Sequence, residues 1–228
     1  MKINVVTIFP DFFAAPLAIS IPARAAAAGQ VEYRIVDLRD YTHDRHRTVD
    51  DYPYGGGPGM VMKPQPFFEA VDALAPTGPI VLMSARGRRF VQSDAVRFAA
   101  SEERTILCGH YKDVDQRVAD HLATEELSLG DFVLSGGEPA ALAIVDATVR
   151  LLPGAMSDHE SAFSDSFWDR GISAPSYTRP PEYRGHTVPE ILLSGDHGKI
   201  ARWRESEGER LTRERRLASD PSTPESAD

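Results

Sequence analysis

Cysteine is almost absent from this chain of 228 residues, in which Cys108 is the only one. A single thiol excludes an internal disulfide framework and any zinc site built from several cysteines. This usage is typical of proteins in a reducing compartment, so we expect a cytoplasmic protein.

Two common nucleotide-binding signatures are also missing. No Gly-x-Gly-x-x-Gly occurs, which excludes the frequent dinucleotide fingerprint, and no Gly-Lys-Ser/Thr follows a glycine loop, which excludes a Walker phosphate cradle. Near the N-terminus the apolar run of residues 3–9 is too short for a signal peptide or a membrane span, and Asp11 interrupts it. We therefore expect no contact with a membrane.

Basic residues are outnumbered, with 25 Lys and Arg against 34 Asp and Glu and a net charge of −9. This balance favours solubility and argues against a protein that coats nucleic acid with its whole surface. An RNA partner remains compatible, because phosphate contact needs only a local basic surface. The length suits one large domain, or one domain with a small appendage.

Apolar runs alternate with helix-like stretches as far as residue 152. Strand-like runs fall at residues 3–9, 31–38, 78–83, 104–108 and 131–134, and helix-like stretches at 67–75, 93–101, 113–123 and 138–152. Strands that alternate with helices predict an α/β fold with a largely parallel sheet that is covered on both faces.

The character of the chain changes after Pro153. Residues 157–169 are polar and acidic without an apolar period, which is typical of a linker or a mobile loop. A second unit begins near residue 174 and ends in a helix-like stretch, 199–217, followed by a tail at 218–228 that we expect to be frayed. We predict a domain at 1–156, a mobile linker at 157–173 and a small C-terminal domain at 174–228.

Small or flexible residues follow three of the apolar runs, at 84–87, 109–111 and 135–137. Ligands of open parallel sheets bind beyond the carboxyl ends of the strands, and glycine lets backbone groups come close to a ligand. Three such loops can hold an adenosine by backbone hydrogen bonds. An alternative stays open, because Ser135–Glu138 is also a capping-box pattern followed by a proline suited to the first helical turn.

A second glycine cluster lies at Tyr54–Met60, in the sequence Tyr-Gly-Gly-Gly-Pro-Gly-Met. It is either a flexible turn or a loop that places backbone N–H groups against a substrate. The charged segment before it contains His43 and His46, but no third ligand follows at a convincing spacing, so we predict no metal site there.

Six segments together carry a resemblance to a known family. They are Thr42–Met60, Cys108–Tyr111, Gly130–Glu138, Asp165–Phe167, Tyr177–Pro180 and Leu192–Gly195, and the match runs in one order from residue 1 to about residue 217. In these motifs the chain resembles the tRNA (guanine-N1)-methyltransferases called TrmD. The resemblance implies a SPOUT fold, which is a mostly parallel α/β sheet with a deep trefoil knot. It also implies a homodimer with shared active sites and a small α-helical C-terminal domain that contacts tRNA.

The resemblance also implies the reaction, in which S-adenosylmethionine methylates N1 of guanosine-37 in tRNA, next to the anticodon. The donor site that it implies consists of Leu82, Met83, Ser84, Ala85, Gly109, Tyr111, Ser128, Leu129, Gly130, Asp131, Phe132, Val133, Leu134, Gly136 and Gly137. The implied substrate site consists of Asp50, Tyr54, Gly55, Gly56, Gly57, Pro58, Gly59 and Ser194.

Asp165 and Arg150 are the catalytic pair that the resemblance implies. Guanine N1 is a poor nucleophile until its proton leaves, and a carboxylate such as Asp165 can take that proton. A guanidinium such as Arg150 can then stabilise the charge that develops on O6. Plainer interpretations stay open, since Asp165 lies in an acidic segment where a carboxylate is usually just solvated. Arg150 stands four residues after Asp146 and can form a surface ion pair.

The chain departs from the family pattern at several positions. Ala85 stands where many members have proline, Pro139 and Ala140 replace a common Leu-Pro order, and Lys112 stands where many members have glutamate. That glutamate has been linked to a dependence on magnesium, which a lysine ammonium cannot ligate, so a magnesium cofactor stays open. The C-terminal stretch offers cations for phosphate contact, although some of them can equally pair with glutamates on the same helix: Lys199, Arg202, Arg204, Arg210, Arg213, Arg215 and Arg216.

Two other functions stay open. The chain can be a different SPOUT enzyme that methylates a ribose 2′-hydroxyl or another base, although such enzymes typically lack the Tyr54–Met60 loop. It can also be a non-enzymatic RNA-binding module with a vestigial donor pocket, against which Asp165 and Arg150 argue.

Overall fold

A computed structural model of the chain describes residues 1–156, 165–168 and 171–218. Contacts divide the chain into two units, residues 1–159 and 160–228. Most of the predicted linker at 157–173 and nearly all of the predicted tail at 218–228 lie outside the described residues.

The first unit is built on a five-stranded sheet in the order β2-β1-β6-β5-β8. Its strands are β1 (Lys2–Thr7), β2 (Glu32–Asp37), β5 (Ile80–Arg89), β6 (Glu103–Cys108) and β8 (Glu125–Ser128). Every neighbouring pair is parallel, so the prediction of an α/β fold with a parallel sheet is confirmed. All five strands thus end at the same edge of the sheet.

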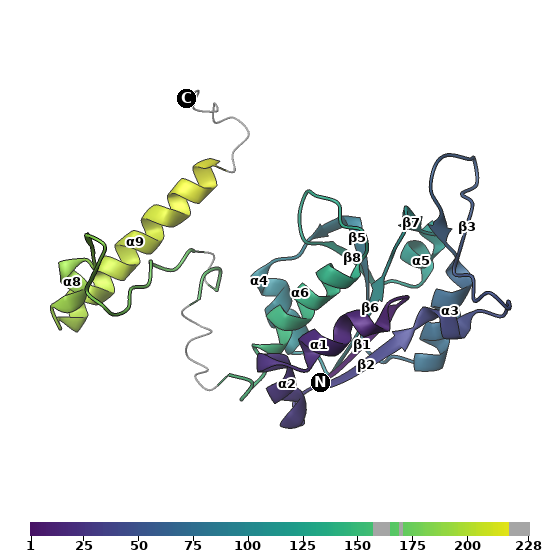
Figure 1. The fold of residues 1–228 in the computed structure, drawn as a ribbon, viewed down its shortest axis with the longest axis horizontal. Helices are drawn as coiled ribbons and strands as arrows, with labels where there is room; N and C mark the ends of the chain where they lie inside the picture. The colour runs from purple at the N-terminus through teal and green to yellow at the C-terminus, as the bar shows by residue number, and fades with distance from the viewer. Residues whose placement is uncertain (157–164, 169–170, 219–228) are drawn as a thin grey trace. The chain divides into compact units, whose positions relative to one another are not determined.

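Helices cover both faces of this sheet (Figure 1). Alternate strand residues point to opposite faces, so that Val81, Ile106 and Cys108 join one core while Leu82 and Leu107 join the other. The first core is closed by α2 (Ser20–Ala27), α4 (Gln92–Ala99) and α6 (Glu138–Val149), and the second by α3 (Pro64–Leu74) and α5 (Gln116–His121).

The remaining elements of the first unit are short. They are η1 (Pro10–Phe13), α1 (Ala14–Leu17), η2 (Leu38–Tyr41) and a small sheet of β3 (Asp50–Asp51), β4 (Val61–Met62) and β7 (Asp113–Val114) in the order β3-β4-β7. The small sheet joins the segment before the glycine cluster to the segment after β6.

The expected strand at 131–134 is wrong. These residues form a loop in which Phe132 and Val133 are 55% and 85% exposed. The strand instead lies at β8, where Leu127 is fully buried and Glu125 meets arginines from β5, α4 and β6. The apolar run at 131–134 does not form a strand, because it does not pack against the sheet or a helix. The sequence pattern did not reveal β8, because its glutamates make it look polar although Glu125 is paired with arginines.

Residues 84–87 belong to β5 and do not follow it, contrary to the expectation. Met83 and Arg88 both pair with Leu127 of β8, so the four residues between them bulge out of the ladder. The helices over residues 10–27 were not expected from the apolar pattern.

The capping box expected as an alternative at Ser135–Glu138 is not formed. The N-cap of α6 is Gly137, no side chain caps it, and Pro139 occupies the first helical turn. The first turn of α6 therefore begins directly on the two glycines that end the loop after β8.

Within its described residues, the second unit contains a hairpin and two helices. β9 (Glu182–Tyr183) pairs antiparallel with β10 (His186–Thr187), and α8 (Glu190–Leu193) precedes the long α9 (His197–Ala218). The helix expected at 199–217 is confirmed. No helix in the described ranges of either unit has the length and apolar character needed to cross a membrane.

Candidate functional site

A pocket of about 190 Å³ opens at the carboxyl edge of the five-stranded sheet. It is formed where the chain leaves β6, bulges from β5 and runs from β8 into α6. Its lining residues are Met83, Ser84, Ala85, Arg86, Gly109, His110, Tyr111, Lys112, Asp113, Val114, Leu127, Ser128, Leu129, Phe132, Val133, Leu134, Ser135, Gly136, Gly137 and Ala140.

Most of the predicted donor-site residues therefore lie together around one cavity. Three do not line it. Leu82 is buried in the core on the α3 side, Gly130 holds the turn after β8, and Asp131 pairs with Arg89 at 2.7 Å. Several lining residues were not predicted, of which His110 lies within the Cys108–Tyr111 motif and Lys112 directly follows it.

Two glycines bring the walls of this pocket into backbone contact. A β-carbon on Gly137 would lie 2.9 Å from the Cys108 Cα and 3.0 Å from the Met83 Cβ. A β-carbon on Gly109 would lie 2.6 Å from Val114 Cγ2. The Gly137 N–H donates to the Gly109 carbonyl at 2.8 Å. These positions need glycine because α6 starts directly against the end of β6.

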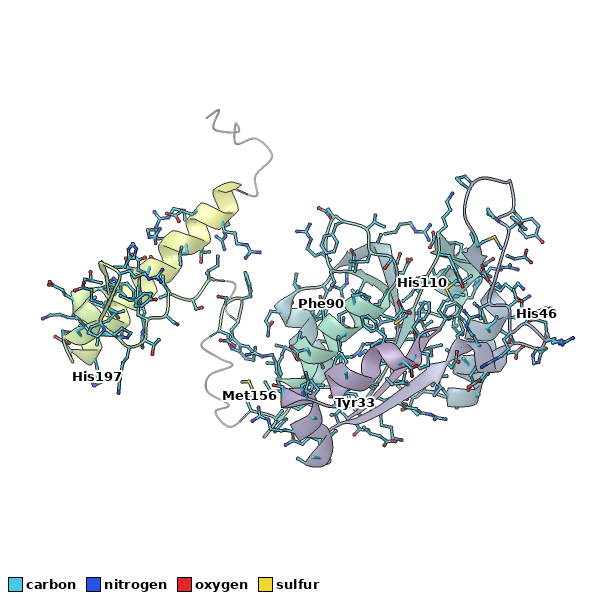
Figure 2. All side chains as sticks on the ribbon, viewed as in Figure 1. Tyr33, His46, Phe90, His110, Met156 and His197 are labelled. Atoms are coloured by element: carbon cyan, nitrogen blue, oxygen red, sulfur yellow. The ribbon has the colours of Figure 1, made fainter. Side chains whose placement is uncertain are left out.

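A buried carboxylate, Glu138, lies beside Gly136, in the loop that leads into α6. It is 2% exposed and accepts a hydrogen bond of 2.7 Å from the Thr7 hydroxyl at the end of β1. The ring of His110 approaches it to 4.0 Å and also packs edge-on against Phe9. Figure 2 labels His110 near the carboxyl edge of the sheet. Glu138 thus ties α6 to β1 below the pocket.

The only cysteine, Cys108, ends β6 in the buried core, directly before the pocket residue Gly109, and is inert. Cys108 is fully buried, and burial together with the neighbouring Glu138 carboxylate raises the pKa of its thiol well above the usual value. A protonated, buried thiol is not a nucleophile, so the chemistry of the pocket does not involve it.

A charged network holds the bulge of β5 in place. Arg88 binds Asp94 with two hydrogen bonds of 2.7 Å and reaches Glu125 of β8 at 2.9 Å, and Arg97 of α4 contacts both carboxylates. Burial would raise the pKa of Asp94, but the hydrogen bonds from Arg88 and Arg97 outweigh it and lower that pKa to about 2. The strand is therefore clamped directly after the residues that line the pocket.

The glycine cluster is a loop in which four glycines adopt left-handed backbone angles. Gly55, Gly56, Gly57 and Gly59 have φ between 75° and 109°, which L side chains rarely adopt. Tyr54 beside them is fully exposed, and Asp50 lies in β3 at the base of the loop. The predicted substrate residues 50–59 are thus adjacent in the fold, and glycine is required for the shape of their loop.

The two histidines before this loop do not form a metal site. His43 contacts Glu69 at 2.8 Å, and His46 is exposed on the surface (Figure 2). Within the described ranges, no group of three or more His, Cys, Asp or Glu side chains is placed to hold a metal ion.

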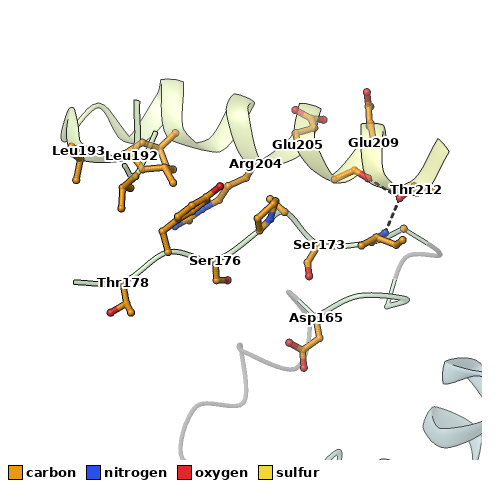
Figure 3. A pocket seen from close by; sticks show the side chains of 18 of the residues that line it. Asp165, Ser173, Ser176, Thr178, Leu192, Leu193, Arg204, Glu205, Glu209 and Thr212 are labelled. Carbon is orange, nitrogen blue, oxygen red and sulfur yellow. Dashed lines mark hydrogen bonds between the residues drawn. The ribbon is translucent and has the colours of Figure 1, made fainter. Parts of the chain in front are cut away.

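The predicted catalytic pair and Ser194 are divided between the two units. Arg150 is the C-cap of α6 in the first unit, whereas Asp165 and Ser194 belong to the second. Asp165 borders a cavity of about 1670 Å³ that lies between α9 and the chain at 171–181, and its side chain points away from α9 (Figure 3). Ser194 ends α8, where its hydroxyl donates to the Ile191 carbonyl at 2.7 Å.

Known proteins match this chain along nearly its whole length. The family model described as tRNA (Guanine-1)-methyltransferase TrmD matches residues 1–219. A tRNA (guanine-N(1)-)-methyltransferase of Dehalococcoides mccartyi is 50% identical over 220 residues, which are 95% of this chain and 89% of that protein. Proteins with the same name from Gloeobacter violaceus and Geobacillus kaustophilus are 50% and 46% identical over 222 and 215 residues. They cover 95% and 93% of this chain, and 96% and 88% of their own lengths.

Proposed function

Because the chain belongs to the TrmD family of tRNA (guanine-1)-methyltransferases, we propose that it methylates N1 of guanosine-37 in tRNA with S-adenosylmethionine as the donor. The family membership carries the activity, and the pocket at the carboxyl edge of the sheet supports a site for the donor. We propose the cytoplasm as the place of the reaction.

The donor is proposed to bind in the pocket between Gly109, Leu129 and Gly137. Glycines at the ends of β6 and of the loop before α6 bring backbone groups to the surface of the cavity, which suits an adenosine. The cavity of about 190 Å³ is smaller than the roughly 300–1,000 Å³ common for ligand pockets. A further surface therefore has to complete its open side.

That surface is proposed to be a second copy of the chain. Phe132, Val133 and Leu134 border the pocket, and they are 55%, 85% and 41% exposed. Three consecutive exposed apolar residues are a feature of interaction sites. A homodimer that covers this loop would bury them and close the donor site. We also propose the deep trefoil knot of the family for the segments around the pocket.

Asp165 and Arg150 are the proposed catalytic residues. Asp165 takes the proton from guanine N1, and the N1 lone pair then attacks the methyl carbon while the carbon–sulfur bond breaks with its electrons remaining on sulfur. Arg150 stabilises the negative charge that develops on O6. The products are N1-methylguanosine and S-adenosylhomocysteine. The base has to leave its stack to expose its Watson–Crick edge.

The second unit is the proposed tRNA-contacting domain. Its α9 carries arginines on an exposed surface, and Arg204, Arg213 and Arg216 border the cavity beside Asp165. Two cations of the helix are paired with carboxylates, Arg210 with Glu207 and Glu214 at 2.7 Å and Lys199 with Asp196 at 3.2 Å. The phosphate contacts therefore fall to the other cations of the helix.

Replacement of Asp165 by Asn tests the proposed mechanism. Loss of a positioned base should lower kcat roughly 10²–10⁴-fold, measured as transfer of labelled methyl groups to a tRNA transcript with guanosine at position 37. Affinity for S-adenosylhomocysteine, measured by calorimetry, should stay unchanged. Asp72→Asn on the exposed side of α3 is the matched control and should keep full activity. Full activity of Asp165→Asn would exclude this carboxylate as the base.

A further inference from the structure

Lys112 lies between the donor pocket and the loop of the glycine cluster Tyr54–Met60, which is called the glycine loop below. Its Cβ and Cδ are 3.1 Å and 3.4 Å from the position that a β-carbon on Gly59 would occupy, and its Nζ is 3.8 Å from the corresponding position at Gly57. Lys112 also lines the donor pocket. The same side chain thus touches both parts of the candidate site.

The backbone fixes this placement. The Lys112 N–H donates to the Met60 carbonyl at 3.1 Å, and the residues that follow pair in parallel with β4, Asp113 with Val61. Tyr111 has a φ of 61°, so the chain turns sharply before Lys112. The stem of the side chain consequently packs on glycine and does not extend freely into solvent.

Neighbouring cations are already paired, whereas the Lys112 ammonium is not. Arg86 contacts Asp113 at 3.0 Å, and Arg117 contacts Asp115 at 2.7 Å. Among the residues that the structure describes, no hydrogen bond or ion pair reaches the Lys112 ammonium. The chain as a whole has a net charge of −9 and repels a polyanion, whereas Lys112 is an exposed positive charge. A polyanion is therefore attracted to this place by the local charge and not by the net charge of the protein.

We propose that the Lys112 ammonium contacts a phosphate of the tRNA beside the target nucleotide and so positions the substrate over the donor pocket. This inference rests on the proposed function for the identity of the RNA. A lysine ammonium is a compact point charge that suits a phosphate oxygen. The glycine loop leaves room above it for the sugar-phosphate chain, because Gly55 and Gly56 have no neighbouring atom within 4 Å of a β-carbon position.

The salt dependence of tRNA binding tests the proposal. The variants Lys112→Gln and Lys112→Arg are compared with the wild-type protein, and Lys2→Gln is the matched control, because Lys2 lies at the amino end of β1 on the opposite edge of the sheet. Affinity for a folded tRNA transcript is measured at fixed magnesium and between low and moderate potassium chloride. Affinity for S-adenosylhomocysteine is measured in parallel.

Lys112→Gln should weaken tRNA binding up to about tenfold at low salt and lower the slope of log Kd against log salt by about 0.7–0.9, the effect of one phosphate contact. Lys112→Arg and Lys2→Gln should keep the wild-type slope, and all variants should bind S-adenosylhomocysteine equally. An unchanged slope for Lys112→Gln overturns the proposal. So does a loss of S-adenosylhomocysteine affinity with tRNA affinity kept, which would assign the ammonium to the donor carboxylate.

These outcomes are independent of the proposed reaction. If the wild-type protein fails to form N1-methylguanosine, the proposed function fails, whereas the slope still decides whether Lys112 touches a phosphate. If the wild-type protein methylates N1 and the slope of Lys112→Gln is unchanged, only the Lys112 contact fails.

Discussion

At Gly137 the first turn of α6 comes so close to β6 that a side chain has no room. The nearest backbone atoms to a β-carbon there are the Cys108 Cα at 2.9 Å and the Gly109 nitrogen at 3.1 Å, and backbone atoms cannot move aside as a flexible side chain can. The loop that ends at this glycine borders the donor pocket, so its position should set the affinity for the donor.

Gly137→Ala should therefore push α6 away from the sheet, lower the free energy of unfolding by about 1–3 kcal/mol, and weaken S-adenosylhomocysteine binding at least tenfold. Isothermal titration calorimetry and urea unfolding measure both effects. Gly198→Ala in α9 is the control, because its β-carbon meets no atom closer than 3.5 Å. If Gly137→Ala and Gly198→Ala bound S-adenosylhomocysteine equally well, the close contact at Gly137 would have no effect on donor binding and the prediction would be wrong.

The sequence predicted which loops gather around this pocket, but not which side chains face it. Gly109 and Gly137 were expected from their place after apolar runs, and the Gly137 N–H donates to the Gly109 carbonyl at 2.8 Å. Leu82 was expected too, yet strict alternation along β5 turns its side chain into the opposite core. Single-residue orientation in a strand depends on the register of the sheet, which the sequence motif does not contain.

Among the elements, the bulge of β5 depends most clearly on charge. Asp94 at the start of α4 is 5% exposed and receives hydrogen bonds from Arg88 and Arg97. Its pKa falls from an ordinary value of 3.8 to about 2, so the folded state favours the ionised form. The stabilisation is complete above about pH 4 and is lost as the pH falls towards 2.

The free energy of unfolding should therefore differ between the wild-type protein and Asp94→Asn by on the order of 1–2 kcal/mol at neutral pH. This difference should shrink between pH 4 and pH 2. Urea unfolding followed by circular dichroism measures it, because both tryptophans, Trp168 and Trp203, lie in the second unit and do not report on α4. Asp72→Asn, an exposed change on α3, should show no such trend. A constant difference across this range would show that Asp94 is not held as a carboxylate by the network.

The pattern of apolar residues predicted several of the strands and helices, but it failed at β8, where charged residues are paired. β1, β2, β6 and α6 fall where the sequence predicts them, because β1 and β6 are almost continuously buried runs and the buried residues of α6 recur in a helical period. β8 contains Glu125 and Glu126 and looks polar, since the arginines that neutralise Glu125 come from distant parts of the chain. Burial of a paired charge is a tertiary effect that local pattern does not record.

For the whole molecule, the exposed loop Phe132–Leu134 carries the prediction of a dimer. The chain of 25.0 kDa should have twice that mass in solution by multi-angle light scattering. Val133→Asp, at a side chain that is 85% exposed, should shift the mass towards one copy and weaken S-adenosylhomocysteine binding, since a charge would be buried without a partner. Asp72→Asn should remain dimeric. A monomeric wild-type protein that binds the donor fully would contradict the shared site.

The distribution of charge over the whole chain agrees with a selective RNA partner. The net charge is −9, yet Lys and Arg residues gather along α9, and Lys112 adds an exposed cation beside the glycine cluster. A protein of this kind binds RNA at defined places and not over its entire surface. The sequence predicted the basic helix, whereas the position of Lys112 against the glycine loop required the fold.

The most direct test of the account is the position of the methyl group on tRNA after reaction with the wild-type protein and S-adenosylmethionine. Mass spectrometry of nucleosides and fragments from a transcript with guanosine at position 37 should find N1-methylguanosine there, and replacement of that nucleotide by adenosine should abolish transfer. A 2′-O-methylated nucleotide, or undiminished transfer after the replacement, would contradict the assignment of this chain to N1 methylation of guanosine-37.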